Sequence, residues 1–324
     1  MERSIRMGVV GLGLMGEVHV RVYQSLEGVE VVGCVEPNQA RAAAIQERYN
    51  VKIFSEVNEL LRHVDAISIC TPDHMHKETI LAAFRQGVKV LVEKPLDVSS
   101  TNCQEILAAM PDETFLMVGH VLRFDPRVWR AKQILDGGEL GKILSVKVWR
   151  SNSMASGRKI GQRTSVTWFL GIHDVDMVLW LLNQPKITNV QAMGAKVFTP
   201  YWDYVSATLQ TEAGTIVSVE NGWILPVERV TGLDAGIQIT GEQGMIEVNL
   251  THADVRVTSA QRGRSMLMDT FHWPEIGGEL QGDLRIELEA FVRAVRYNEI
   301  PPVTAKEAAA AVDIVERIEK ALEQ

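Results

Sequence analysis

The chain has 324 residues, of which 46% are apolar and 23% charged, and its formal net charge is −8. This length allows two domains with separate cores, and the composition is typical of a globular protein rather than a disordered one. Acidic and basic residues are interspersed without a basic cluster, so we expect neither nucleic acid nor a membrane as a partner. No apolar run approaches a membrane span or a signal core, and we expect a cytoplasmic protein.

The first predicted elements are a strand, a tight turn and a helix, centred on Gly11-Leu-Gly13-Leu-Met-Gly16. Gly11 permits a backbone conformation that a side chain would forbid, Gly13 lets a pyrophosphate approach, and Gly16 lets the helix lie close to the strand. The helix N-terminus, with Leu14 and Met15, would present N–H groups to the phosphates. The alternative is a glycine turn without a ligand.

A second apolar strand, residues 29–35, ends in Glu36, 20 residues after Gly16. An acid at this place binds the ribose 2′-hydroxyl of NAD and repels the 2′-phosphate of NADP. We therefore predict NAD rather than NADP as the cofactor. A solvated charge at a strand end is the alternative interpretation of Glu36.

Strands and helices alternate up to about residue 120. Helices are predicted at 39–48, from 55, at 74–86 and at 99–110, and strands at 51–54, 66–70, 88–92 and 115–119. This alternation predicts a doubly wound parallel sheet that binds its ligands at the carboxyl ends of the strands. We expect residues 1–120 to form a Rossmann dinucleotide-binding domain of the α/β class.

The pattern changes in the second part of the chain. Helices are predicted at 126–135, 177–182, 284–297 and 305–322, and short strands at 142–150, 188–197, 204–211, 215–222, 235–241, 245–249 and 255–259. These segments indicate an α+β domain over residues 121–324 with a mostly antiparallel, open sheet. Because an open sheet face needs cover, we expect a homo-oligomer, a dimer or a tetramer.

The three cysteines, Cys34, Cys70 and Cys103, are widely separated, and the first two lie in apolar strands. This placement favours buried reduced thiols over disulfides. We find no convincing metal-ligand spacing and expect no metal.

Four segments carry unusual polar residues: Cys70-Thr-Pro-Asp-His-Met-His76, Glu93-Lys94-Pro95, Gly119-His-Val-Leu-Arg123-Phe-Asp-Pro126 and Gly171-Ile-His173-Asp174-Val-Asp176. Together with the glycine turn, in this order and at these distances, they resemble the Gfo/Idh/MocA oxidoreductases, the family of glucose-fructose oxidoreductase and inositol dehydrogenase. The resemblance covers essentially the whole chain. It implies an NAD-dependent oxidoreductase that acts on an alcohol carbon of a sugar, polyol or sugar derivative.

The resemblance also implies residue roles. Lys94 matches the lysine between nicotinamide and substrate, Pro95 the residue often joined by a cis peptide, and His173 the catalytic histidine. It implies cofactor contacts for Thr71, Pro72, His74, His76, Glu93, Lys94 and His120, and substrate contacts for Lys94, Arg123 and His173.

The chemistry of the residues agrees with these roles. Oxidation of an alcohol requires a base for the hydroxyl proton, for which a histidine is suited, and a cation such as Lys94 stabilises the alkoxide-like oxygen. A surface lysine and a structural histidine are the alternatives. Asp174 and Asp176 are expected to cap the helix that follows rather than to act in catalysis.

The stretch 151–167 reads as a loop with Arg158, Lys159 and Arg163, which together with Trp168 are candidates for holding an anionic or sugar substrate. A solvated loop with a core tryptophan is the alternative.

The chain departs from the family pattern at Phe169, where many relatives carry an aspartate, and at Val121, where an asparagine is common. Two other functions therefore stay open: an NAD-retaining enzyme that cleaves a glycosidic bond, and a non-catalytic NAD-binding sensor.

Overall fold

The structure is a computed structural model that describes residues 3–226, 228–229, 232–251, 255–257, 260, 266–268 and 271–324. The chain divides into two compact units. The first comprises Met1–Val121 and Trp273–Val312, and the second comprises Leu122–His272 and Asp313–Gln324. The units do not follow the chain in order, because the segment from Trp273 packs with the N-terminal part.

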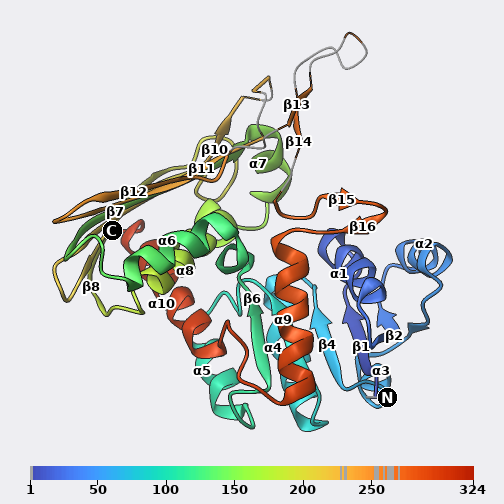
Figure 1. Cartoon of the computed structure of the whole chain (residues 1–324). Coiled ribbons are helices and arrows are strands. Elements are labelled where there is room, and N and C mark those ends of the chain that lie inside the picture. Colours follow the sequence, from blue (N-terminus) through green and yellow to red (C-terminus); the bar gives the residue numbers. More distant parts are fainter. Residues whose placement is uncertain are drawn as a thin grey trace. The chain divides into compact units, whose positions relative to one another are not determined.

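The first unit contains a parallel sheet with the strand order β3-β2-β1-β4-β5-β6 (Figure 1). Its strands are β1 (Ile5–Val10), β2 (Val29–Val35), β3 (Ile53–Phe54), β4 (Ala66–Ile69), β5 (Lys89–Glu93) and β6 (Leu116–Gly119). The order reverses between β1 and β4, which is where such a sheet binds its ligand. The predicted doubly wound sheet is confirmed.

Helices lie against both faces of this sheet. They are α1 (Leu14–Ser25), α2 (Gln39–Tyr49), α3 (Val57–Leu61), α4 (His76–Arg85), α5 (Ser100–Ala109) and α9 (Asp283–Tyr297), with a 3-10 turn η1 (Asp73–Met75). α1 contacts α9, and α4 contacts α3 and α5. Because both faces are covered, a strand such as β4 is buried along its whole length. The short strands β15 (Glu275–Ile276) and β16 (Glu279–Leu280) pair before α9.

The second unit contains a six-stranded sheet in the order β12-β11-β7-β10-β9-β8. Its strands are β7 (Ile143–Ser153), β8 (Ile187–Ala195), β9 (Tyr204–Thr211), β10 (Ile216–Leu225), β11 (Leu233–Gly241) and β12 (Met245–Asn249). β7 and β10 pair in parallel, and the other described pairs are antiparallel. The mostly antiparallel sheet is therefore confirmed.

The remaining elements are η2 (Val121–Phe124), α6 (Pro126–Asp136), α7 (Met154–Ile160), the π-helix η3 (Thr167–Gly171), α8 (Ile172–Leu181), α10 (Ala305–Ala321) and the strand pair β13 (Val255–Val257) and β14 (Met266–Met268). Residues 258 and 259, the end of a predicted strand, lie outside the described residues. α7, α8 and η3 contact one face of the six-stranded sheet.

The predicted loop over 151–167 is wrong. β7 continues to Ser153, whose hydroxyl accepts a hydrogen bond from the N–H of Ser156 and caps α7. Inside α7, a Cβ on Gly157 would lie 2.5 Å from Cβ of Trp223, so the glycine allows the helix to pack on β10. This tertiary contact overrides the low helix propensity of serine and glycine.

Candidate functional site

In the glycine turn between β1 and α1, each of the three glycines is needed for a different reason. Gly11 has φ +87°, and a Cβ there would lie 2.8 Å from the carbonyl group of Cys70. A Cβ on Gly16 would lie 1.9 Å from the Gly11 oxygen, whereas one on Gly13 would meet no atom within 4 Å. Gly11 and Gly16 therefore serve the fold, and Gly13 leaves open space at the start of α1, which no side chain caps. These features fit a dinucleotide pyrophosphate.

Glu36 follows β2 and lies beside this turn. Its carboxylate accepts hydrogen bonds from the N–H of Leu12 at 2.8 Å and from the N–H of Asn38 at 2.9 Å. The side chain is half-buried, and each carboxylate oxygen has a further lone pair. The placement fits an acceptor for ribose hydroxyls.

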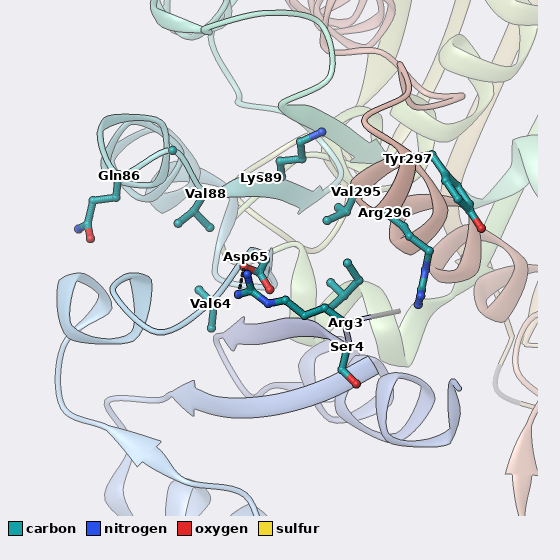
Figure 2. Close-up of a pocket in the computed structure, with 12 residues that line it drawn as sticks. Arg3, Ser4, Val64, Asp65, Gln86, Val88, Lys89, Val295, Arg296 and Tyr297 are labelled. Carbon is teal, nitrogen blue, oxygen red and sulfur yellow. Dashed lines mark hydrogen bonds and ion pairs between the residues drawn. The ribbon is translucent and has the colours of Figure 1, made fainter. Parts of the chain in front are cut away.

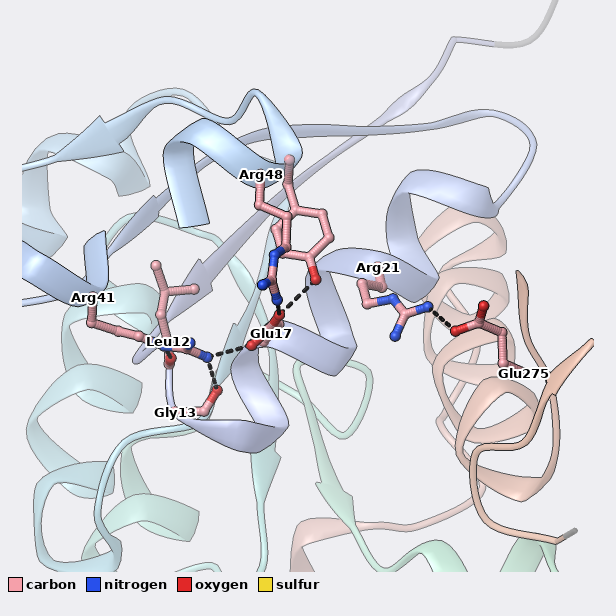
Figure 3. Close-up of polar contacts among 8 residues, drawn as sticks. Leu12, Gly13, Glu17, Arg21, Arg41, Arg48 and Glu275 are labelled. Atoms are coloured by element: carbon pink, nitrogen blue, oxygen red, sulfur yellow. Dashed lines mark hydrogen bonds and ion pairs between the residues drawn. The ribbon is translucent and has the colours of Figure 1, made fainter. Parts of the chain in front are cut away.

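A residue missed by the sequence reasoning, Arg41, supports the same turn from α2. Its guanidinium donates to the oxygens of Leu12 at 2.6 Å and Gly13 at 3.3 Å, and to Glu17 at 2.5 Å (Figure 3). Glu17 also accepts from Arg48 and from the hydroxyl of Tyr49. Burial acts to raise the pKa of Glu17, but these three donors outweigh it and lower the pKa to about 2. No local pattern links α1 with α2, so the sequence carries no signal for this contact.

The segment after β4 carries Thr71, Pro72, His74 and His76. Pro72 and His74 are exposed, and the buried hydroxyl oxygen of Thr71 has no hydrogen-bond partner among the described residues. A buried polar atom of this kind fits a polar group of a ligand. The predicted cofactor residue His76 is instead fully buried, 2.9 Å from the Pro95 oxygen and 3.0 Å from the Thr71 oxygen.

β5 ends at Glu93, and the half-buried Lys94 follows it at the carboxyl edge of the sheet. The Lys94–Pro95 bond is cis, as the resemblance implied. The Glu93 carboxylate lies 3.1 Å from Nε2 of His19 on α1. Burial raises the pKa of this carboxyl, but the hydrogen bond and charge of His19, together with the charges of Lys94 and His76, lower it overall. His120 follows β6, and its side chain is buried.

In the second unit, η3 and α8 form one continuous helical run. Near its start, the side chains of Trp168, Phe169 and His173 are half-buried, whereas the residues from Asp174 to Leu179 are buried. The ring of Phe169 lies 5.5 Å from that of the fully buried Trp223. A π-turn of this kind often occurs at functional sites.

Asp174 and Asp176 do not cap α8, and that prediction is wrong. Asp174 accepts from Arg150 at 2.9 Å and from Asn221 at 2.8 Å, and burial raises the pKa of its carboxyl despite these partners. Asp176 accepts two hydrogen bonds from Arg123, at 2.6 and 2.9 Å. The reason is that η3 precedes α8 without a break, so the start of α8 needs no cap.

The predicted substrate-binding cations of this unit differ in how exposed they are and in the element that carries them. Arg123 is 3% exposed, so its contact with Asp176 is internal. Arg163 is exposed after α7, and the guanidinium of Arg158 lies 5.5 Å from the ring of Phe198. Arg158 and Lys159 belong to the last turn of α7 rather than to a loop.

A cavity of about 570 Å³ lies at the amino-terminal ends of the strands of the parallel sheet. Figure 2 shows the residues that line it. It is lined by Ile5 and Lys89, the first residues of β1 and β5, and by Asp65, Arg296 and Tyr297. It is therefore separate from the carboxyl ends of the strands, where the candidate cofactor residues lie.

Within the described ranges, no group of three or more histidine, cysteine, aspartate or glutamate side chains is arranged to hold a metal ion. In the same part of the chain, no helix is long and apolar enough to cross a membrane.

Comparison with known proteins identifies both parts of the chain. Residues 5–120 match the model of the oxidoreductase family with an NAD-binding Rossmann fold, and residues 128–247 match the GFO/IDH/MocA C-terminal domain. The chain belongs to the Gfo/Idh/MocA oxidoreductase family. It is an NAD-dependent oxidoreductase, so the predicted class and cofactor are confirmed. The glycosidase and sensor alternatives are not supported.

The curated relatives include inositol 2-dehydrogenase 2 of Saccharopolyspora erythraea, 28% identical, over 97% of this chain and 91% of the relative. They also include the NAD-dependent scyllo-inositol 2-dehydrogenase of Bacillus subtilis, 26% identical, over 94% and 90%. Among solved structures, scyllo-inositol dehydrogenase from Lactobacillus casei with bound NAD(H) and scyllo-inositol has a TM-score of 0.82 at 19% identity, over 99% of this chain and 97% of that one.

Proposed function

We propose that the chain transfers hydride between NAD and a secondary alcohol carbon of a cyclic polyol of the inositol type. The names of the inositol dehydrogenases among its relatives support this substrate class. The observation that carries the proposal is the position of Lys94. It follows β5 at the edge of the parallel sheet on which the glycine turn, Glu36 and Thr71 also lie. An ammonium at this edge suits an oxygen that gains negative charge during oxidation.

In the proposed reaction, the hydroxyl proton passes to His173 and a carbonyl forms at the same carbon. NAD, when bound, would supply the acceptor for the hydride from that carbon. Lys94 holds the substrate oxygen and stabilises its negative charge. Trp168 packs against the polyol ring, and Arg163 donates hydrogen bonds to its hydroxyls. Arg123 acts indirectly, because its guanidinium holds Asp176 on α8.

The cofactor would be held by residues of the first unit. Gly11, Gly13, Leu14, Met15 and Gly16 would hold the pyrophosphate, Glu36 the adenosine ribose, and Thr71, Pro72, His74, Glu93 and His120 the nicotinamide half. His76 would contribute through the backbone segments that it contacts. We therefore assign cofactor binding to residues 1–120, and substrate binding and oligomerisation to residues 121–324.

We further propose a homo-oligomer that forms through the six-stranded sheet. The face of this sheet away from α7, α8 and η3 carries exposed apolar side chains, among them Ile216 and Ile224 of β10 and Met193 of β8. Such a face favours association. Sedimentation velocity should give a multiple of 36.1 kDa, and a monomer would contradict this assignment. The use of NAD and the presence of the cysteines as thiols rather than disulfides support a cytoplasmic location.

The test of the proposed function is an assay of the purified protein with NAD and myo-inositol, scyllo-inositol, aldoses, uronates and nucleotide sugars, monitored by the absorbance of reduced nicotinamide. We expect an inositol to react and the Lys94→Ala variant to lose about 100-fold or more in kcat. The matched control is Lys306→Ala, which removes an exposed lysine of α10. An unchanged rate in Lys94→Ala would contradict the assigned role of the lysine.

A further inference from the structure

Lys94 stands between two residues that are each contacted by a buried histidine from a different helix. His19 of α1, 1% exposed, lies 3.1 Å from the carboxylate of Glu93. His76 of α4, fully buried, lies 2.9 Å from the carbonyl oxygen of Pro95. The chain is thus fixed immediately before and immediately after Lys94.

The surroundings of His76 leave it no role as a ligand of a bound molecule. Its second ring nitrogen lies 3.0 Å from the carbonyl oxygen of Thr71, so the ring bridges two backbone segments that follow β4 and β5. Carbonyl oxygens only accept, so a ring nitrogen of His76 that carries a hydrogen donates to the carbonyl oxygen beside it. A glutamine side chain carries both of its N–H donors on a single nitrogen, so it does not reproduce contacts made by two separate ring nitrogens.

His19 is likewise surrounded by polar groups with little exposure to solvent. The Glu93 side chain is 13% exposed, and the other ring nitrogen of His19 lies 3.6 Å from Sγ of Cys70 at the end of β4. Further titratable groups close to this pair are Tyr23 of α1, which hydrogen-bonds Ser68, and Glu287 of α9. The hydrogen bond from His19 helps to keep the pKa of Glu93 low, so this carboxyl stays ionised.

We propose that His19 and His76 are positioning residues that fix the place of the Lys94 ammonium, His19 through the Glu93 carboxylate and His76 through the Pro95 carbonyl. This inference rests on the proposed function, in which Lys94 holds the substrate oxygen. It also links the lysine to the cofactor turn, because His19 belongs to α1, whose N-cap is Gly13 and whose N-terminus would face the pyrophosphate. His76 connects the lysine to the Thr71 segment in the same way.

The first experiment is a double-mutant cycle with NAD and the inositol that reacts. His19→Leu and His76→Gln should each lower kcat about tenfold or more, because small misplacements of a catalytic group have large effects on rate. The KM for NAD should change less than about threefold, because neither ring contacts the cofactor in this arrangement. In a Lys94→Ala background, each histidine substitution should lower the remaining rate by less than about twofold.

The matched control is His63→Gln, an exposed histidine whose ring lies 5.5 Å from that of Phe54. It should leave kcat unchanged. The positioning role would be overturned if each histidine substitution lowered kcat by the same factor in the Lys94→Ala background as in the wild type. Unchanged kcat in both histidine variants would also overturn it. A Lys94→Ala variant with full activity would instead contradict the proposed function.

A second experiment needs no substrate. Acetic anhydride labels lysines as free amines, and mass spectrometry of the folded protein compares Lys94 with Lys306. In a His19→Leu variant, Glu93 loses the hydrogen bond that holds the chain just before Lys94, so labelling of Lys94 should rise about threefold or more. Thermal melting and NADH titration confirm that the variant is folded. An unchanged ratio of Lys94 to Lys306 labelling in a folded variant would contradict the proposal for His19.

Discussion

The Glu17 contacts predict a measurable pH dependence of stability. Its carboxylate accepts hydrogen bonds from Arg41 at 2.5 Å, Arg48 at 2.8 Å and Tyr49 at 2.6 Å, and the side chain is 17% exposed. Burial opposes ionisation, but the three donors lower the pKa from 4.5 to about 2. That difference corresponds to about 3 kcal/mol of stability at neutral pH.

The sign follows from the direction of the change. Because the pKa is lower in the folded state, the contribution is fully present above the unfolded pKa of 4.5 and is lost as the pH falls toward 2. A Glu17→Gln variant cannot ionise, so it should be less stable than the wild type by about 2–3 kcal/mol at pH about 7. The difference should shrink steadily between pH about 4.5 and about 2.

The assay is urea unfolding of wild type and Glu17→Gln at several pH values, with Glu47→Gln as the control for an exposed carboxylate of α2. The control should differ from wild type by less than about 0.5 kcal/mol. Because Glu17 also holds Arg41 against the glycine turn, NADH affinity should fall severalfold in Glu17→Gln. A stability difference that is independent of pH would refute the assignment of the low pKa to these three donors.

Three further predictions concern the cofactor turn and the buried ion pair of the second unit. Glu36→Ala should weaken NADH binding about tenfold and reduce the preference over NADPH, and an unchanged preference in fluorescence titration would exclude the ribose role. Gly13→Ala should keep the melting temperature but weaken NADH binding, whereas Gly16→Ala should lower the melting temperature, because its Cβ would lie 1.9 Å from a backbone oxygen. Arg123→Met should lower the free energy of unfolding by about 3–5 kcal/mol, because it leaves Asp176 buried without this partner. A loss below about 1 kcal/mol in urea unfolding would show that the pair is dispensable.

The parallel sheet and the glycine turn could be predicted because their determinants are local. The buried strands are short apolar runs bounded by polar residues, and the helices between them have apolar residues at helical spacing. The φ of +87° at Gly11 and the close approach at Gly16 follow from the spacing of the three glycines. The predicted bounds of most elements differ from the observed ones by a few residues, since helix and strand ends depend on weak local preferences.

The errors concern residues whose partners are distant in sequence. Asp174 and Asp176 have the spacing of helix-cap residues, but their partners Arg150 and Arg123 lie 24 and 53 residues away. Arg41 and Glu17 are linked across 24 residues, from one helix to another. Local patterns assign such side chains to solvent or to helix ends, because a buried ion pair becomes visible only when the two elements are packed together.

At Phe169, one feature can be read from the sequence and another only from the structure. The family resemblance marks position 169 as a departure, with an aromatic residue in place of an aspartate. The structure shows where the ring lies: its centroid is 5.5 Å from that of the fully buried indole of Trp223, at the π-turn η3. The surroundings of position 169 therefore suit an apolar side chain. The proposed proton exchange therefore depends on His173, four residues further along the same helical run, without a carboxylate at position 169.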